Sequence, residues 1–404
     1  MKIKAIFNRH SPLLLFFFLI GFSTFGQNSV IISGQDPNRR VITTAVPFLN
    51  FAPDSRHSGM GDVGVATSPD ANSAHWNSGK LAFIKDDLGF SLSYSPWLGK
   101  LVNDMSLSYL TGFKRIDENS AFGFDLRYFN MGDIQLTDGR GNDVGEFNPR
   151  DIAIGGTYSR KLSQNFGLGI SARFIYSNLS GNISSSGGNE ARAGIGVGAD
   201  IGLYYQKPTL IGSKEGTWAW GVSITNIGPK ITYNSAEDLD YIPTNLRVGT
   251  SYGIFFNPDN KITFSLDLNK LMVPTPPVYA TNEDGTLATD ENGDLIIESG
   301  KDPNRPLISG MFGSFADAPG GFEEEMREFT ISFGAEYVYA EKFALRTGYF
   351  YENPTKGGRR YFTMGLGLDI NRIGIDFSYL VPQVQNHPLA ETLRFTLLYT
   401  IANN

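Results

Sequence analysis

Side chains able to do chemistry gather in a glycine-rich stretch near the start of the chain. Ser55, His57 and Ser58 stand almost side by side, and a second histidine, His75, follows further on. A hydroxyl group next to an imidazole can act as a nucleophile with a general base. The stretch lacks the G-x-S-x-G pattern that presents a nucleophilic serine on a sharp turn. We therefore expect no catalytic residue and a protein that is not an enzyme, with a lipid hydrolase as a remote alternative.

Two other patterns could bind a ligand, but neither has the spacing that its ligand requires. The glycines of Gly194–Gly198 are spaced like part of a dinucleotide loop, yet they lie inside a strand pattern. An acidic run further along could offer oxygen ligands to calcium, but it lacks the spacing and the closing glutamate of an EF-hand. We expect no cofactor and no metal, and a solvated loop at the acidic residues Asp284, Asp290, Glu291 and Asp294.

The composition excludes several classes of protein. The 404 residues include no cysteine, so disulfide scaffolds, cysteine-ligated zinc sites and thiolate nucleophiles are excluded. The 34 basic and 41 acidic residues give a net charge of -7, which does not favour nucleic-acid binding. The chain has 46 glycines and only 19% charged residues. Both values fit an ordinary soluble enzyme poorly.

The first 26 residues have the organisation of a cleaved signal peptide. Lys2, Lys4 and Arg9 form a basic start, and Leu13–Phe22 is an unbroken apolar run that is too short to span a bilayer as a helix. Small residues then precede a cleavage point that would leave Gln27 as the mature N-terminus. Export is therefore predicted, with an uncleaved membrane anchor as the alternative.

Alternation of apolar and polar residues with a period of two is the strongest pattern in the chain. Near the C-terminus, Leu393, Phe395 and Leu397 alternate with Arg394 and Thr396. This places apolar groups on one face of a strand and polar groups on the other. Helical periodicity is weak after residue 85, so the pattern predicts an all-β fold. Similar alternation occurs at residues 122–128, 195–203, 262–269 and 328–339.

About fourteen such strands can be counted, an even number that suits a closed antiparallel barrel. Connections after even-numbered strands are short, with Lys207–Glu215 as the exception, and those after odd-numbered strands are long. A membrane barrel with a periplasmic N-terminus shows this alternation of turns and outer loops. We therefore predict a transmembrane antiparallel β-barrel over residues 86–404, with a water-soluble β-sandwich as the alternative. The strands are expected to begin near residues 86, 103, 120, 148, 164, 190, 216, 244, 260, 327, 341, 359, 372 and 390.

Residues 27–85 precede the barrel and are expected to form a plug inside its lumen. Their glycines and small residues allow the backbone to approach the barrel wall closely. The residues expected to form this lumenal segment are Arg56, His57, Gly59, Met60, Gly61, Trp76 and Asn77.

The longest predicted outer loop covers residues 273–326. Asn282–Gly285 and Glu291–Asp294 have the turn chemistry of a small hairpin. The second half of the loop carries apolar groups beside glycines, and such groups need a surface to bury against. That surface could be a protein partner, exported cargo or the barrel's own mouth. The candidate partner- and cargo-binding residues are Met311, Phe312, Phe315 and Phe322.

The N-terminal stretch also carries a specific resemblance. S-R-H-S-G-M-G-D-V-G-V-A at residues 55–66 and S-P-D-A-N-S-A-H-W-N at residues 68–77 resemble the start of the PorV (LptO) family. This family comprises outer-membrane barrels of the type IX secretion system within the wider group of FadL-like barrels. The resemblance extends over essentially the whole mature chain. It includes P-F-L at residues 47–49 and D-L-G-F-S-L-S-Y-S-P-W-L at residues 87–98.

The resemblance implies a non-enzymatic role in the bacterial outer membrane. Members of the family accept secreted proteins through a C-terminal signal domain and dock at the lateral opening of a large translocon barrel. They then pass the cargo to a sortase-like attachment partner at the cell surface. Membrane lipid and lipopolysaccharide would surround the barrel. The alternative function is a FadL-like channel for hydrophobic small molecules, with the N-terminal segment as a hatch.

Overall fold

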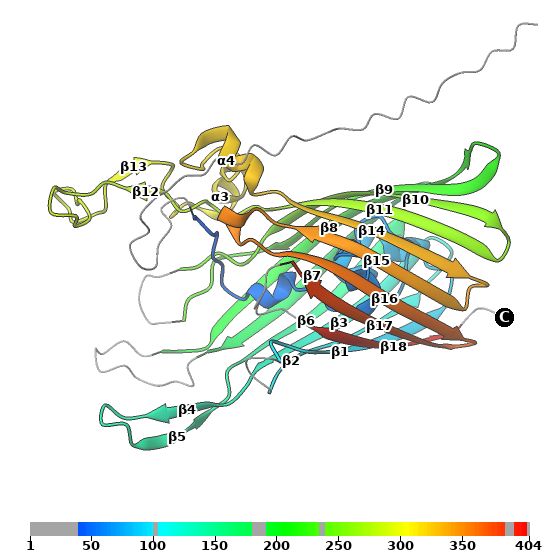
Figure 1. Ribbon diagram of the computed structural model, residues 1–404, viewed down its shortest axis with the longest axis horizontal. Coiled ribbons are helices and arrows are strands. Elements are labelled where there is room, and N and C mark those ends of the chain that lie inside the picture. The colour runs from blue at the N-terminus through cyan, green and yellow to red at the C-terminus, as the bar shows by residue number, and fades with distance from the viewer. Residues whose placement is uncertain (1–38, 100–103, 180–190, 234–238, 384–391, 402–404) are drawn as a thin grey trace, which may run out of the picture. The chain divides into compact units, whose positions relative to one another are not determined.

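The computed structural model describes residues 39–99, 104–179, 191–233, 239–383 and 392–401, and the predicted signal peptide lies outside them. Fourteen antiparallel strands form a closed barrel, which confirms the predicted fold class (Figure 1). The barrel strands are β1 (Leu88–Pro96), β2 (Met105–Arg115), β3 (Ser120–Met131), β6 (Arg150–Lys161), β7 (Phe166–Asn178), β8 (Gly194–Ile211), β9 (Lys214–Ile227), β10 (Asn245–Asn257), β11 (Asn260–Leu271), β14 (Thr330–Tyr339), β15 (Phe343–Tyr351), β16 (Arg360–Ile370), β17 (Ile373–Pro382) and β18 (Leu393–Ile401).

The strands follow the predicted alternation of side chains. In β18, Arg394 and Thr396 point into the barrel and are buried, whereas Phe395 and Leu397 face outward and are about half exposed. An outward apolar face suits contact with lipid, and an inward polar face suits a lumen. The ring closes where β1 pairs with β18, from Leu88 opposite Ile401 to Tyr94 opposite Phe395.

Each barrel strand begins within four residues of its predicted start. The prediction that Lys207–Glu215 forms a longer connection was wrong. Strand β8 continues to Ile211 and β9 starts at Lys214, so only two residues form the turn. One of them, Gly212, has a φ of 65°, which glycine adopts without the steric cost that a β-carbon would add. All connections after even-numbered barrel strands are therefore tight turns, and they share the short-turn end of the barrel (Figure 1).

The opposite end carries the long connections and is called the long-loop end here. Strands β4 (Ile134–Thr137) and β5 (Asp143–Phe147) pair into a hairpin there. In the longest loop, β12 (Val278–Tyr279) pairs with β13 (Ile297–Ser299), and Gly285 and Gly293 adopt positive φ in the turns between them. The same loop contains two helices that the sequence analysis did not predict, α3 (Leu307–Gly313) and α4 (Gly321–Arg327). No helix among the described residues is long and apolar enough to cross a membrane.

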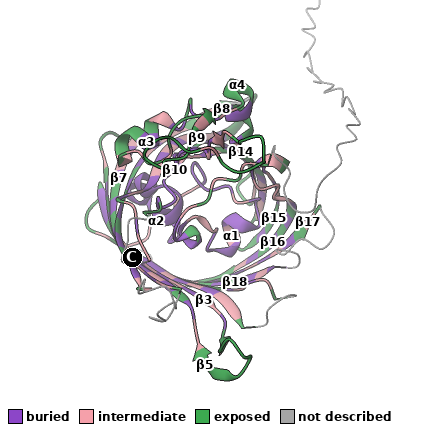
Figure 2. Ribbon diagram, turned by 90° about the vertical axis from the view of Figure 1, so that its left-hand side faces the viewer, coloured by how far each residue is buried: buried purple, intermediate pink, exposed green. Residues whose placement is uncertain are grey.

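Residues 45–84, called the plug here, lie inside the ring of strands, where Figure 2 shows α1 and α2. The plug consists of four short helical turns that loops connect. Their bounds are η1 (Pro47–Asn50), α1 (Ser55–Ser58), α2 (Ser73–Trp76) and η2 (Ser78–Phe83). Such short helices are not stable alone, so contacts with the wall must hold them.

The chain reaches the plug from the long-loop end. Ala45 donates a backbone hydrogen bond to Tyr241, in the connection after β9, and Arg40 pairs with Glu324 of α4. Phe48 and Leu49 pack against Trp97 and other residues near the long-loop ends of the strands. The chain then runs through the lumen to the start of β1 at the short-turn end.

Candidate functional site

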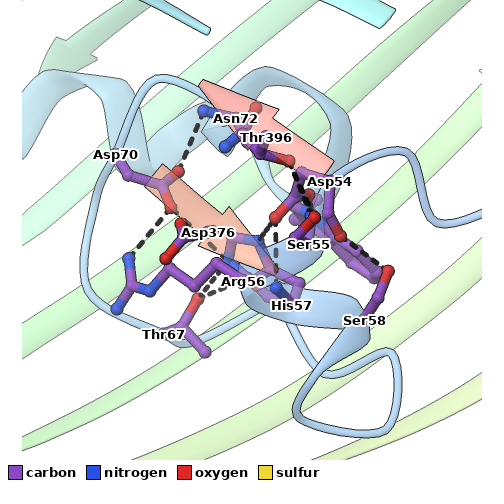
Figure 3. A network of polar contacts seen from close by, with 12 residues as sticks. Asp54, Ser55, Arg56, His57, Ser58, Thr67, Asp70, Asn72, Asp376 and Thr396 are labelled. Atoms are coloured by element: carbon purple, nitrogen blue, oxygen red, sulfur yellow. Dashed lines mark hydrogen bonds and ion pairs between the residues drawn. The ribbon is translucent and has the colours of Figure 1, made fainter. Parts of the chain in front are cut away.

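Asp54 joins two of the helical turns in the plug (Figure 3). Its carboxylate caps α1 by accepting the backbone N–H of His57, and Oδ2 lies 2.7 Å from His57 Nδ1. Its other oxygen, Oδ1, accepts a 2.8 Å hydrogen bond from Trp76 Nε1 of α2. Burial raises the pKa of Asp54, but the attraction of His57 and the hydrogen bonds from His57 and Trp76 outweigh it and lower the pKa to about 2. Asp54 is therefore ionised, and it holds α1 against α2.

The hydrolase alternative finds no serine beside the imidazole. Ser58 donates its hydroxyl to the carbonyl of Asp54, and Ser55 contacts Thr396 of β18. The hydroxyl next to His57 belongs to Thr67, at 3.0 Å from Nε2.

The resulting Asp54–His57–Thr67 series has the order of a catalytic triad but not its accessibility. All three residues are at most 1% exposed. The Thr67 hydroxyl donates to the carbonyl of Gly64 and accepts from Lys80 Nζ at 2.8 Å. Because the Thr67 hydroxyl is buried and makes hydrogen bonds to Gly64 and Lys80, this arrangement is suited to holding the plug together. The sequence analysis did not predict a role for Thr67 or Lys80, because neither residue belongs to a recognisable motif.

Arg56 ties the plug to one side of the wall through paired charges. Its guanidinium makes two 3.0 Å contacts with Glu336 of β14 and a 2.9 Å ion pair with Asp70 of the plug. Glu336 also pairs with Arg346 of β15 at 2.8 Å, and Arg346 reaches Asp376 of β17 at 2.5 Å. Buried charges of this kind are tolerated only when each has a partner.

The Gly59-Met60-Gly61 backbone runs directly against the wall. Gly61 has a φ of 74°, and a β-carbon there would lie 2.6 Å from the backbone nitrogen of Tyr349. Wall glycines leave the matching space, since a β-carbon on Gly348 would lie 2.1 Å from the carbonyl carbon of Met60. Only glycines facing one another permit this approach.

Other plug residues are bonded to the remaining sides of the ring. Asn77 Nδ2 donates to the carbonyl of Leu203 in β8 at 2.8 Å, and Asp267 of β11 accepts the backbone N–H groups of Gly64 and Val65. Arg127 of β3 donates to a carbonyl of η1 at 2.6 Å. The plug is thus tied to strands on opposite sides of the barrel, and it lies in the lumen between them.

The predicted partner-binding residues do not form one cluster. Met311 of α3 is 3% exposed and packs inward, whereas Phe312 is 62% exposed and Phe322 of α4 is 80% exposed. Phe315 is 39% exposed, and the ammonium nitrogen of Lys270 lies 5.4 Å from the centre of its ring. The exposed apolar side chains of α3 and α4, called the α3–α4 platform here, are Ile308, Phe312, Phe322 and Met326.

Ion pairs hold the α3–α4 platform on the barrel. Lys270 of β11 pairs with Glu325 at 3.1 Å and with Glu328, and Lys356 pairs with Glu324 at 2.7 Å and with Glu328 at 2.8 Å. Glu324 also accepts a hydrogen bond from the guanidinium of Arg40. Burial raises the pKa of Glu324, but hydrogen bonds from Arg40 and Lys356 outweigh it and lower the pKa to about 2.

The acidic side chains of the longest loop accept hydrogen bonds from backbone N–H groups within its turns. Asp290 accepts the backbone N–H groups of Asn292 and Asp294, and Asp284 accepts that of Thr286. Among the described residues, no group of three or more acidic or histidine side chains could hold a metal ion.

Comparison with solved structures finds other barrels at low sequence identity. The toluene transporter TbuX of Ralstonia pickettii is 15% identical, with 89% of this chain and 100% of that chain covered and a TM-score of 0.48. The toluene transporter TodX of Pseudomonas putida is 12% identical, with coverages of 85% and 96% and a TM-score of 0.45. A FadL homologue of Pseudomonas aeruginosa is 12% identical, with coverages of 90% and 99% and a TM-score of 0.41. With TM-scores below 0.5, these likenesses add nothing to the topology observed directly.

Sequence comparison is more specific. No curated protein matches the chain. The family model described as type IX secretion system protein PorV matches residues 34–278, which is more than half of the 404 residues. The matched region includes the whole plug and nine of the barrel strands, β1 to β11 without the β4–β5 hairpin. The chain therefore belongs to the PorV family of type IX secretion system proteins.

Proposed function

We propose that this protein is a non-enzymatic cargo carrier of type IX secretion in the outer membrane. It binds the large translocon barrel at its lateral opening and accepts secreted proteins through their C-terminal signal domain. It then passes them to a sortase-like attachment partner at the cell surface. Membership of the PorV family supports the general role, and the partners named here are the proposed part.

The observation that carries the proposal is the α3–α4 platform. It presents Phe312 and Phe322 outward, although aromatic side chains on a free surface are unfavourable without a partner. Ion pairs of Glu324 and Glu325 fix α4 to the barrel, so this helix loses little conformational freedom when a partner binds. A fixed apolar surface with a charged border is typical of a protein-docking site.

The alternative of a channel for hydrophobic small molecules gains no support from the structure. Such a channel needs a continuous path through the barrel. Here the plug is buried between strands on opposite sides and is bonded to both.

The proposal is tested by purifying the tagged protein from its own outer membrane in mild detergent and identifying the proteins recovered with it. Purification of the Phe312→Ser/Phe322→Ser variant should recover much less of the translocon barrel or of the exported proteins than purification of the parent protein does. The matched control is Ile134→Ser/Val144→Ser, which removes two exposed apolar side chains from the β4–β5 hairpin at the same end. Unchanged recovery and normal secretion with the platform variant would contradict the proposed role of the platform.

A further inference from the structure

A groove of about 570 Å³ lies on the outer face of the barrel at the short-turn end. Its lining comes from β16, β17, the turn between them and β18, which lie side by side in the ring (Figure 1). Ile370 faces Ile373 across the β16–β17 ladder, and Leu368 faces Ile375 two residues further from the turn. The lining residues are Leu368, Ile370, Asn371, Arg372, Ile373, Ile375 and Tyr399.

The aliphatic side chains of the groove point away from the lumen. Ile373 and Ile375 are 49% and 52% exposed, whereas Gly374 and Asp376, which alternate with them along β17, are buried on the lumen side. Outward apolar residues of an outer-membrane barrel contact the acyl chains of lipids. The groove therefore opens to the membrane and is separate from the plug.

One end of the groove is polar. Asn371 and Arg372 form the two-residue turn between β16 and β17, and Asn371 adopts a φ of 57°, which asparagine tolerates better than most residues. Tyr399 of β18 stands opposite Ile373 and lines the same end. The turn marks the edge of the outward apolar band, which is the level of the lipid headgroups. The groove thus combines a cation at headgroup level with aliphatic side chains that continue towards the middle of the membrane.

The side chain of Arg372 differs from other cations at the short-turn end, because those have partners within the protein. Arg115 pairs with Asp87 at 2.7 Å, and the Lys214 ammonium group lies 4.0 Å from the centre of the Phe256 ring. Arg372 is exposed, and no ion pair, side-chain hydrogen bond or ring contact joins it to another residue in the part of the chain that the structure describes. Its guanidinium is therefore available to an anion from outside the protein.

We propose that this groove binds one glycerophospholipid molecule of the membrane leaflet at the short-turn end. The phosphate lies against Arg372, because a guanidinium offers paired N–H donors to phosphate oxygens. One acyl chain lies along Ile373 and Ile375. The charge holds one lipid at one position, in contrast to the lipids that exchange freely around the rest of the barrel. This site is independent of the proposed role in secretion.

Native mass spectrometry of the delipidated protein in detergent tests this binding. The protein is titrated with dioleoyl phosphatidylethanolamine and, separately, with dioleoylglycerol, which has the same chains but no phosphate. Glycerophosphoethanolamine, which has the phosphate but no acyl chains, is the third probe. One phospholipid should bind at a concentration about tenfold lower than dioleoylglycerol does, and glycerophosphoethanolamine should not bind.

Substitutions at Arg372 separate the charge from the apolar contacts. Arg372→Gln should weaken binding of the phospholipid about tenfold and leave that of dioleoylglycerol unchanged. Arg372→Lys should keep part of the preference, since an ammonium group keeps the charge but not the paired donors. The matched control is Arg160→Gln, because Arg160 is exposed at the short-turn end of β6 and does not line the groove. Heat-dependent mobility on gels checks that each barrel is folded.

Three results would overturn the proposal. Binding of dioleoylglycerol as tight as that of the phospholipid, or no binding of the phospholipid, would show that the groove does not recognise the phosphate. Equal binding of the phospholipid by Arg372→Gln and Arg160→Gln would show that Arg372 does not hold it. Tight binding of glycerophosphoethanolamine would show that the apolar part of the groove contributes nothing. Secretion and partner recovery, measured separately, report on the carrier function alone.

Discussion

Arg56 links the plug to the wall through more charged contacts than its neighbours. Replacing it with leucine would remove the 2.9 Å ion pair of Asp70 and leave Glu336 with Arg346 alone. Removing one partner of a buried ion pair typically costs about 3–5 kcal/mol of unfolding free energy. We expect Arg56→Leu to lower the thermal unfolding midpoint, measured by heat-dependent mobility on gels, by far more than an exposed substitution does.

The matched control for Arg56 is Arg327→Leu in α4. Arg327 pairs with Glu323 one helical turn away, and both side chains are exposed. Pairs of this kind contribute about 0.2–0.5 kcal/mol. Equal midpoints for the two variants would show that the Arg56 network does not hold the plug.

The sequence analysis expected Arg56, His57 and Trp76 in a lumenal segment, because glycines and small residues allow the backbone to approach the barrel wall closely. It gave no indication of their partners. Glu336 stood on the polar face of a predicted strand, but it is 280 residues from Arg56 along the chain. Pairing of such distant residues depends on the register of the closed barrel, which local patterns do not encode.

Among the elements, strands were easier to predict than helices. Alternation over nine or more residues marks a barrel strand wherever one face meets lipid and the other a polar lumen. The error at Lys207–Glu215 arose because polar residues at the end of a strand were taken for a loop. The seven-residue helices α3 and α4 are too short to show helical periodicity. Ion pairs with Lys270 and Lys356 stabilise the position of α4, and those lysines lie elsewhere in the sequence.

The attachment of α4 should weaken in acid. The pKa of Glu324 is lowered to about 2 from an ordinary value of 4.5, so its ion pairs stabilise the attached helix above about pH 4.5. That contribution is lost as the pH falls towards 2, because the carboxylate becomes protonated. A spin label on Phe322→Cys should therefore become more mobile over this range, which electron paramagnetic resonance would detect.

The control for this pH effect is the same labelled protein with Glu324→Gln. An amide cannot titrate, so the label should already be mobile at neutral pH, and its mobility should change less in acid. A pH dependence unaffected by Glu324→Gln would assign the effect to another group.

For the molecule as a whole, the structure distinguishes the two ends of the barrel. Val41 lies at the long-loop end, and the β16–β17 turn with Asn371 lies at the other. The chain has no cysteine, so single cysteines can be labelled without background. In intact cells, a membrane-impermeant maleimide should label Val41→Cys. Asn371→Cys should react only after the outer membrane is permeabilised.

The reverse labelling pattern would show that the long-loop end faces the periplasm. Labelling of both cysteines in intact cells would instead indicate a damaged membrane, which a periplasmic marker protein checks.

The route of the chain through the lumen also constrains how the molecule assembles. The seam that closes the ring joins β1 to β18, the first and last strands to be synthesised. Ser55 in the plug bonds to Thr396 of β18 at this seam, and the barrel strands surround the plug once the seam has formed. We expect the plug to occupy its place before or while the final strand pairs. Packing of the N-terminal segment and closure of the ring would then compete kinetically during folding. A barrel that closed before the segment had packed would lack the plug in its lumen.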